Sequence, residues 1–510
     1  MPRMGCIVMK PGEVDFSDVQ GLVRFGYSKM KEASYVHLRI RDRTAARAWL
    51  RSAPITSAAT QAPPPSTAMQ VAFTAAGLEA LGVPPSILAS FSSEFLAGMA
   101  EESRARRLGD VGKNAPSEWE WGYGSSLPHL MVMFFAESGR LQALIQESRG
   151  SAWNAAFEEK RWLGTADLDG VEPFGFADGI SQPQIDWEQQ RDVTRPQLDY
   201  GNVVAVGEFL LGYPNEYNKY TDRPLIYADS ASATKLLPAE DAPGKKDIGR
   251  NGTYLVMRQL RQNVRSFWQF LNQQAGGDFA MAERLATAFV GRNRAGDPLV
   301  PMQEKPIPGI GPDPEQIRLN QFTYAKDPMG AGCPFGSHVR RQNPRNTDFP
   351  GRPTGLAKLL TMLGFGPRGF RDDLMSAVRF HRILRRGREF GPEVLPEEAL
   401  KPTPQNDPER GLHFICLNAN ISRQFEFLQN AWTVNTKFTG LSGENDPLLG
   451  VREGIPGYGA SDHFTVQKDG ALRNRLSGLP QFVTMCGGAY FFLPGLRALR
   501  YFARDHDQEK

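Results

Sequence analysis

The stretch TYLVMRQLRQNVRSFWQFLNQQ, residues 253–274, decides the fold, because it changes from a strand pattern to a helix pattern within one run. Residues 253–260 are rich in aliphatic and aromatic side chains and predict a strand. The following residues place Val264, Phe267, Trp268 and Leu271 at positions i, i+3, i+4 and i+7, which is one face of an α-helix. The sequence therefore predicts a strand that leads directly into an amphipathic helix.

The same order of strand and helix occurs twice more. YVHLRI (35–40) precedes DRTAARAWLRS (42–52), in which Asp42 or Thr44 can cap a short helix. GLHFICLNANI (411–421) precedes SRQFEFLQNAW (422–432) in the same way. Further predicted strands are MQVAFT (69–74), HLMVMFF (129–135) and AYFFL (489–493).

These strands mostly alternate on one face, which favours an antiparallel sheet with helices packed on one side over a parallel sheet buried on both faces. The strand and helix patterns form two clusters, at about 30–140 and 250–500. We therefore predict an α+β protein with two ferredoxin-like domains in tandem, spanning residues 1–240 and 241–510. The long loop-rich tracts 184–250 and 301–316 are expected to build or cover a site.

Composition excludes several classes of protein. The 510 residues exceed the roughly 250–300 that one core supports, which agrees with two domains. With 59 basic and 56 acidic side chains, the net charge of +3 gives no reason to expect a nucleic-acid partner. No run of about 18 apolar residues predicts a membrane span. The first 16 residues lack an export signal, and Cys6, Cys333, Cys416 and Cys486 form no CxxC pair, so we expect a cytoplasmic protein with free thiols.

The segment FGFADGISQP (174–183) places one carboxylate, Asp178, between Gly175 and Gly179. Glycines let the backbone approach a flat ligand closely. Among the apolar side chains of Phe174 and Phe176, Asp178 would be partly desolvated and suited to acid/base chemistry. The alternative is a tight turn in which the aspartate bonds its own backbone.

The segment AGCPFGSHVRRQNPRN (331–346) holds one histidine, His338, followed by Arg340, Arg341 and Arg345. A neutral imidazole can ligate haem iron, and arginines can pair with haem propionates. The alternative is a surface loop. The sequence has no HxH or HExxH pair, so a single axial histidine is better supported than a site with several histidine ligands.

The segment RFHRILRRGREFG (379–391) carries five arginines. Such a cluster is usually a solvated basic face. One arginine turned into a pocket would instead stabilise negative charge on a leaving oxygen.

Taken together, these segments resemble the dye-decolourising peroxidase family of haem enzymes. The resemblance rests on GxxDG at 175–179, FGSHVRRQNPR, ILRRGREFG, NANISRQFEFLQNAW (418–432), FTAAGLEALGV (73–83) and FVTMCGGAYFFLPGL (482–496), which are spread along most of the chain. It implies two ferredoxin-like halves with haem between them.

The resemblance implies a role for individual residues. His338 would be the proximal ligand of haem b, with one iron per chain, Asp178 the distal acid/base and Arg385 the distal arginine, with Arg386 and Arg382 as alternatives. Arg341, Gly175, Phe176 and Gly179 would contact the cofactor. Where the family often has an acid beside the proximal histidine, this chain has Ser422, and Glu426 is a possible partner.

The implied activity is a peroxidase that reduces hydrogen peroxide through an oxoferryl intermediate and oxidises bulky organic reductants such as dyes or phenolics. A protein of another class, for haem storage, delivery or iron release, would use the same pocket with little turnover. A flavin or nicotinamide enzyme is disfavoured, because no GxGxxG follows a strand.

Overall fold

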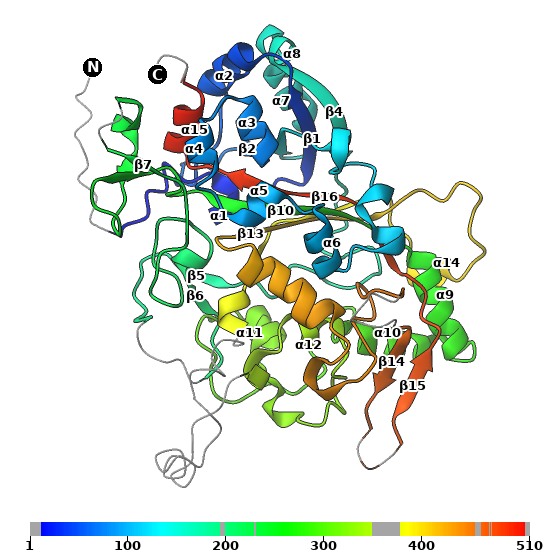
Figure 1. The fold of residues 1–510 in the computed structure, drawn as a ribbon. Coiled ribbons are helices and arrows are strands. Elements are labelled where there is room, and N and C mark those ends of the chain that lie inside the picture. Colours follow the sequence, from blue (N-terminus) through cyan, green and yellow to red (C-terminus); the bar gives the residue numbers. More distant parts are fainter. Residues whose placement is uncertain are drawn as a thin grey trace, which may run out of the picture.

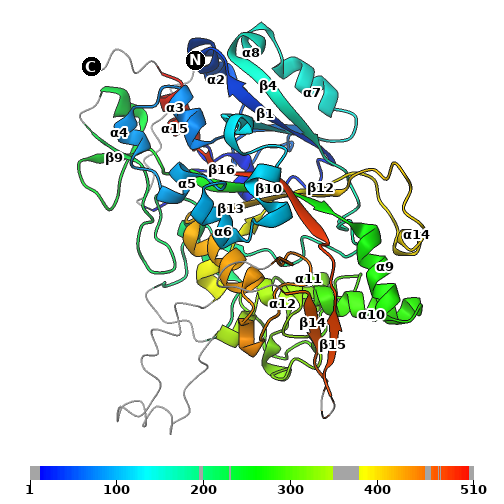
Figure 2. The ribbon, with the colours of Figure 1, turned by 45° about the vertical axis from the view of Figure 1, so that its right-hand side comes forward.

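The computed structural model describes residues 12–193, 199–228, 231–348, 378–453, 461–468, 470 and 472–504. One nine-stranded sheet runs through the molecule in the order β11-β13-β10-β16-β2-β3-β1-β4, with β12 paired to β13. The N-terminal strands and their helices occupy the upper part of the molecule, and α9, α10 and α12 lie below the C-terminal strands (Figures 1 and 2). Within the described residues, no helix has the length and apolar character needed to cross a membrane.

The N-terminal half of the sheet has the strand order of a ferredoxin-like fold. Its strands are β1 (Glu32–Ile40), β2 (Thr67–Phe73), β3 (Leu130–Ala136) and β4 (Phe157–Gly164). They pair antiparallel in the order β4-β1-β3-β2. Helix α2 (Arg43–Ser52) follows the first strand, and α7 (Leu141–Ser148) and α8 (Ser151–Ala156) follow the third. Asp42 caps α2 by accepting the N–H of Ala45, as predicted.

The C-terminal half repeats this order. Strand β10 (Thr253–Gln262) lies between β13 (Gly411–Asn418) and β16 (Val483–Leu493), and the short strands β11 (Leu384–Arg385) and β12 (Arg388–Phe390) pair with β13. Helices α9 (Val264–Gln274) and α10 (Phe279–Val290) follow the first strand. The third strand leads into two π-helical segments, Ser422–Glu426 and Leu428–Val434. The predicted α+β class with two ferredoxin-like halves is confirmed, and the boundary near residue 240 stays a prediction.

The described chain contains further short elements. The helices are α1 (Gly21–Arg24), α3 (Ala75–Ala80), α4 (Pro85–Leu88), α5 (Ser93–Ala97), α6 (Glu102–Leu108), α11 (Pro314–Asn320), α12 (His338–Gln342), α14 (Pro396–Ala399) and α15 (Leu496–Phe502). The strands outside the main sheet are β5 (Gln184–Asp186), β6 (Val203–Ala205), β7 (Leu225–Tyr227), β8 (Leu237–Pro238), β9 (Lys245–Asp247), β14 (His463–Val466) and β15 (Asn474–Ser477).

Both faces of the sheet are buried, but by different kinds of structure. The longer helices pack on one face; Val264, Phe267, Trp268 and Leu271 of α9 are fully buried there, as their spacing predicted. The other face is covered by the largely irregular segments 14–30 and 204–213. Strand β3 is therefore buried along its whole length although it belongs to an antiparallel sheet. Cys333, Cys416 and Cys486 are buried free thiols, and Cys6 lies outside the described residues.

The two halves meet where β16 pairs with β2 at Phe492 and Phe73. Beside this junction Trp121 packs against the backbone of Gly487 and donates its indole N–H to Gln259 Oε1 at 2.8 Å. A Cβ on Gly487 would lie 2.5 Å from the Trp121 ring, so only glycine fits this contact without movement.

Gly487→Ala should therefore destabilise the protein by about 1–3 kcal/mol, because the added methyl overpacks a buried contact between the halves. Thermal or denaturant unfolding measures the effect. Gly164→Ala is the matched control, since a Cβ there meets no atom within 4 Å. Equal stability of the two variants would contradict the proposed role of the Trp121 contact.

Candidate active site

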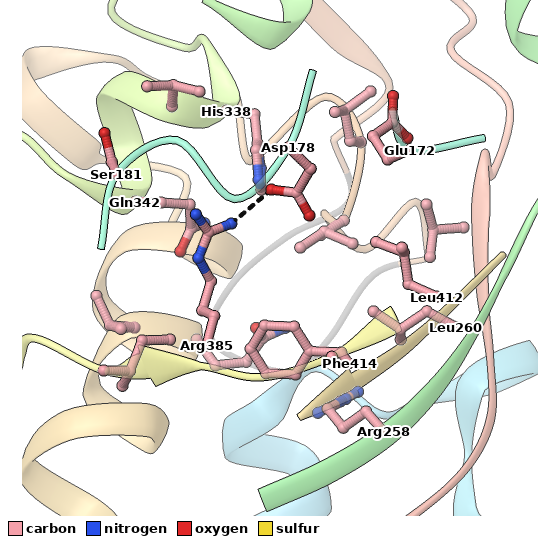
Figure 3. Close-up of a pocket in the computed structure, with 18 of the residues that line it drawn as sticks. Glu172, Asp178, Ser181, Arg258, Leu260, His338, Gln342, Arg385, Leu412 and Phe414 are labelled. Atoms are coloured by element: carbon pink, nitrogen blue, oxygen red, sulfur yellow. Dashed lines mark hydrogen bonds and ion pairs between the residues drawn. The ribbon is translucent and has the colours of Figure 1, made fainter. Parts of the chain in front are cut away.

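A cavity of about 330 Å³ lies against the C-terminal half of the sheet. Strands β10, β12 and β13, helix α12, and the segment 172–182 line it, together with parts of 108–114 from the N-terminal half. Leu260, Leu412 and Phe414 give it an apolar wall, and Asp178, His338 and Arg385 border the same space (Figure 3). The cavity thus brings together the three side chains that the sequence singled out in three separate segments.

The segment that carries Asp178 has no regular secondary structure, and its glycines take left-handed backbone angles. The φ angle is 96° at Gly175 and 74° at Gly179, values that other residues rarely adopt. Phe174 and Phe176 on either side of Gly175 are 2% exposed, and the indole of Trp268 donates to Phe174 O at 3.0 Å. The buried phenylalanines anchor the segment and leave the aspartate at the cavity.

Arg385 forms an ion pair with Asp178, at 2.9 Å between Nη1 and Oδ1. About a third of each side chain is exposed, 34% for Asp178 and 32% for Arg385, so both reach the cavity. Burial alone would raise the pKa of Asp178, but the Arg385 charge and the N–H of Gly179 hold that pKa below its usual value. Asp178 is therefore ionised at neutral pH, and the reading of this segment as a simple turn does not account for its main partner.

Strand β11 fixes Arg385 toward the cavity. The Gln182 side chain accepts the backbone N–H of Arg385 at 3.1 Å and donates to its carbonyl at 3.3 Å. The alternative arginines point elsewhere: Arg386 donates to Leu22 O and Val23 O. Arg382 borders the cavity but donates to Tyr200 and Asn202. Among the alternatives, Arg385 is the arginine that the structure brings to Asp178.

His338 begins α12 and is held by a carboxylate that the sequence did not reveal. Its Nδ1 lies 2.8 Å from Asp446 Oδ2, and since a carboxylate only accepts, Nδ1 carries the proton. The Asp446 side chain is fully buried, whereas His338 is 27% exposed. Burial lowers the pKa of His338, but Asp446 more than offsets this and raises it. The second nitrogen, Nε2, is the one available to a ligand.

Asp446 is itself fixed by its surroundings. Its Oδ1 accepts the backbone N–H groups of Leu448 and Leu449, both at 2.9 Å. Burial raises its pKa, yet His338, the N–H of Leu449 and the charge of Arg341 lower the pKa to about 2 overall. The proposed partner Glu426 is wrong, because its carboxylate is bound by Arg104, Arg107 and Tyr490. The local signal for Asp446 was Asp-Pro-Leu-Leu (446–449), an Asp-Pro turn start, but nothing in it points to His338.

The arginines after His338 turn into the protein. Arg341 donates to the carbonyls of Trp432, Asn435 and Glu444 and is not among the described residues that line the cavity. Arg340 pairs with Asp327, and Arg345 donates to Asn320 O and Phe322 O. Of the other residues expected to contact a cofactor, Phe176 and Gly179 line the cavity, whereas Gly175 lines a smaller neighbouring one.

Comparison with known sequences finds dye-decolorizing peroxidases that are similar to this chain over most of its length. It is 28% identical to the dye-decolorizing peroxidase msp1 of Mycetinis scorodonius over 514 residues, which cover 96% of this chain and 87% of that protein. It is 27% identical to the multifunctional dye peroxidase DyP2 of Amycolatopsis over 448 residues, covering 84% and 81%. No family model matches the chain.

Solved structures give the same result. A fungal DyP-type peroxidase from Auricularia auricula-judae superposes with a TM-score of 0.70 at 25% identity, covering 96% of this chain and all of that one. A dye-decolorizing peroxidase in complex with 2,6-dimethoxyphenol has the same fold, with a TM-score of 0.68 at 23% identity. These relatives in sequence and structure are oxidoreductases that use peroxide.

The contact between Arg385 and Asp178 predicts a change in ionisation. In Arg385→Leu, the pKa of Asp178 should rise above the ordinary range for aspartate, because burial remains and the compensating cation is gone. Carboxyl titration of the ligand-free protein by NMR or infrared spectroscopy measures this. Arg386→Leu is the matched control and should leave the pKa of Asp178 unchanged. If Arg385→Leu also leaves that pKa unchanged, Arg385 is not the cation that lowers it.

Proposed function

We propose, from its kinship with the dye-decolorizing peroxidases, that this chain is a haem peroxidase in which His338 ligates the iron of haem b. Asp178 would be the distal acid/base, and Arg385 the residue that stabilises charge. The observation that carries the proposal is that His338 and Asp178 border one apolar cavity, each fixed by a partner of opposite charge, Asp446 and Arg385.

The residues of the cavity fit a haem group. A single imidazole whose Nδ1–H is bound to a buried carboxylate is a typical haem ligand. No group of three or more His, Cys, Asp or Glu side chains suited to a bare metal ion occurs within the part of the chain that the structure describes. Apolar walls from Leu260, Leu412 and Phe414 suit the faces and edges of a porphyrin. Arg382 lines the cavity, with its guanidinium bound to Tyr200 and Asn202, and is the cation we propose for a propionate.

Bound haem would supply the redox chemistry of peroxide cleavage, and the protein would supply the proton and the charge. The ionised Asp178 would accept a proton at a carboxylate oxygen from hydrogen peroxide and return it to the oxygen that leaves as water. Arg385 would stabilise the negative charge that develops on that leaving oxygen. Asp446 would keep His338 in the tautomer with Nε2 free and increase the basicity of that nitrogen.

The second substrate would be a bulky organic reductant. The relatives are named for dyes, and one of the solved peroxidases holds 2,6-dimethoxyphenol. We therefore propose dyes and phenolics as reductants of this chain, and we retain a cytoplasmic location as a prediction. A haem storage or delivery protein would need the ligand His338 but neither Asp178 nor Arg385, so these two side chains favour turnover over storage.

His338→Ala should lose or grossly alter haem binding, because the variant lacks the proposed iron ligand. Hemin titration of the purified variant, followed by absorption in the Soret region, measures this. His413→Gln is the matched control: His413 also borders the cavity, with its pKa lowered to about 4 by burial, but it should not ligate the iron. An unchanged haem spectrum in His338→Ala would remove that residue as ligand.

Asp178→Asn should bind haem with a nearly unchanged spectrum but react with hydrogen peroxide about 10²–10⁴-fold more slowly, since an amide cannot carry the proton. Stopped-flow absorption of the haem-loaded protein after mixing with peroxide gives the rate. A rate equal to that of the parent would exclude Asp178 as the acid/base. A haem storage or delivery function would then be favoured over a peroxidase.

A further inference from the structure

A second carboxylate, Glu172, holds the segment that carries Asp178. Its Oε2 accepts the backbone N–H of Phe174 at 3.0 Å, and its Oε1 accepts that of Phe176 at 3.1 Å. The backbone of Glu172 closes the same turn, because its N–H donates to Phe176 O at 2.9 Å. The Glu172 side chain therefore helps to hold the backbone just before Asp178, together with Trp268 and Arg294, which donate to the carbonyls of Phe174 and Gly175.

Gln262, on β10, completes the environment of Glu172. Its Nε2 donates to Glu172 Oε2 at 2.7 Å, while its Oε1 is buried and has no hydrogen-bond partner. The Gln262 residue is 5% exposed, so water does not readily satisfy this oxygen. A half-turn of the amide would present Oε1 to Glu172 in place of Nε2. Gln262 can therefore donate to an ionised Glu172 and accept from a protonated one.

Glu172 also lies between two cavities. It lines the main cavity with Asp178 and a second one of about 190 Å³, which Arg294, Glu393 and Leu395 line on other sides. Leu395 is 50% exposed, so the second cavity lies near the protein surface. In Figure 3, Glu172 lies beside the main cavity, apart from the Asp178–Arg385 pair.

The charges around Glu172 come from several elements. Asp178 lies on the same segment, and Glu389 and Arg388 of β12 and His413 of β13 line the main cavity. Arg294, after α10, and Glu393, after β12, line the second cavity. Burial raises the pKa of Glu172 to about 7, with Phe174 N–H, Gln262 and Phe176 N–H opposing the rise and Asp178 adding to it. None of the hydrogen bonds described for the Glu172 carboxylate comes from a cation.

We propose that Glu172 is a positioning residue that fixes the Asp178 segment and passes protons from the second cavity into the main one, with Gln262 turning its amide to serve both protonation states. The inference rests on the proposed peroxidase function. Reduction of one hydrogen peroxide to two waters takes up two electrons, from the organic reductant, and two protons. In each transfer, Glu172 releases a proton to water in the main cavity, and the carboxylate regains one from water in the second cavity.

Infrared titration of the haem-free protein tests the inference without any turnover. The parent should show a carboxylic acid C=O band that is present at low pH and lost as pH rises, with a midpoint near the pKa of about 7. The band is lost as pH rises because it belongs to the neutral acid, which predominates only below the pKa. The band should be absent from Glu172→Gln and should persist in Glu389→Gln and Glu393→Gln.

Isotope labelling keeps the test decisive if Glu172→Gln does not fold. Carbon-13 in the glutamate side-chain carboxyls of the parent should move the band, whereas the same label in aspartate should not. A band that persists in Glu172→Gln, fails to move with labelled glutamate, or disappears in Glu389→Gln overturns the inference. Because no haem is present, these results do not depend on whether the protein is a peroxidase.

The haem-loaded enzyme provides the functional readout. Glu172→Gln should react with peroxide more slowly, by up to about a hundredfold, and should lose the pH dependence centred near 7. Glu393→Gln removes a carboxylate of the second cavity for which no hydrogen bond to the segment is described, and it should keep the parent profile. A slower Glu172→Gln with an unchanged pH profile would show a purely structural role and would contradict the proton transfer.

Discussion

The ion pair between Asp178 and Arg385 is the interaction on which the site depends. It joins an irregular segment that follows the N-terminal half to the edge strand of the C-terminal half, at 2.9 Å. Without the arginine, burial would favour a neutral aspartic acid, which could not accept a proton from peroxide. The strand pairing of β11 with β13 and the two hydrogen bonds from Gln182 fix the arginine in turn. The ionisation state of Asp178 thus depends on the pairing of a short strand at the edge of the sheet.

The His338 side of the cavity follows the same design with the charges exchanged. Asp446 is a fully buried anion whose charge is offset by the imidazole of His338 and by two backbone N–H groups. Fixing the imidazole through its Nδ1 leaves one nitrogen, and only one, for a ligand. Both sides of the cavity therefore use a partner of opposite charge to set the protonation state of the side chain that lines the cavity.

The sequence allowed much of the fold to be predicted, because periodicity is a local property. The predicted strands at 35–40, 69–74, 129–135, 253–260, 411–421 and 489–493 all lie largely within strands of the main sheet, and the buried face of α9 is the predicted one. Strand β4 was missed, since its charged residues Glu158, Glu159 and Lys160 obscure the alternation. Irregular segments cover the second face of the sheet, and such segments have no hydrophobic periodicity from which their position could be predicted.

The site was predictable only where a motif is contiguous. Asp178, His338 and Arg385 each stand in a short distinctive segment, but Asp446 is separated from His338 by 108 positions and stands in an ordinary turn sequence. The arginines after His338 suggested propionate partners. In the structure Arg341 instead satisfies three backbone carbonyls, because a buried guanidinium needs acceptors for its N–H groups wherever they occur. Such contacts depend on tertiary packing, which spacing does not reveal.

The most direct test of the proposed peroxidase activity is a hemin titration of the purified protein, followed by one equivalent of hydrogen peroxide. We expect saturation at one haem per chain, a Soret spectrum of histidine-ligated haem, and a rapid change of that spectrum with peroxide that an added phenol reverses. A protein that takes up no hemin, or whose bound haem does not respond to peroxide, would contradict it.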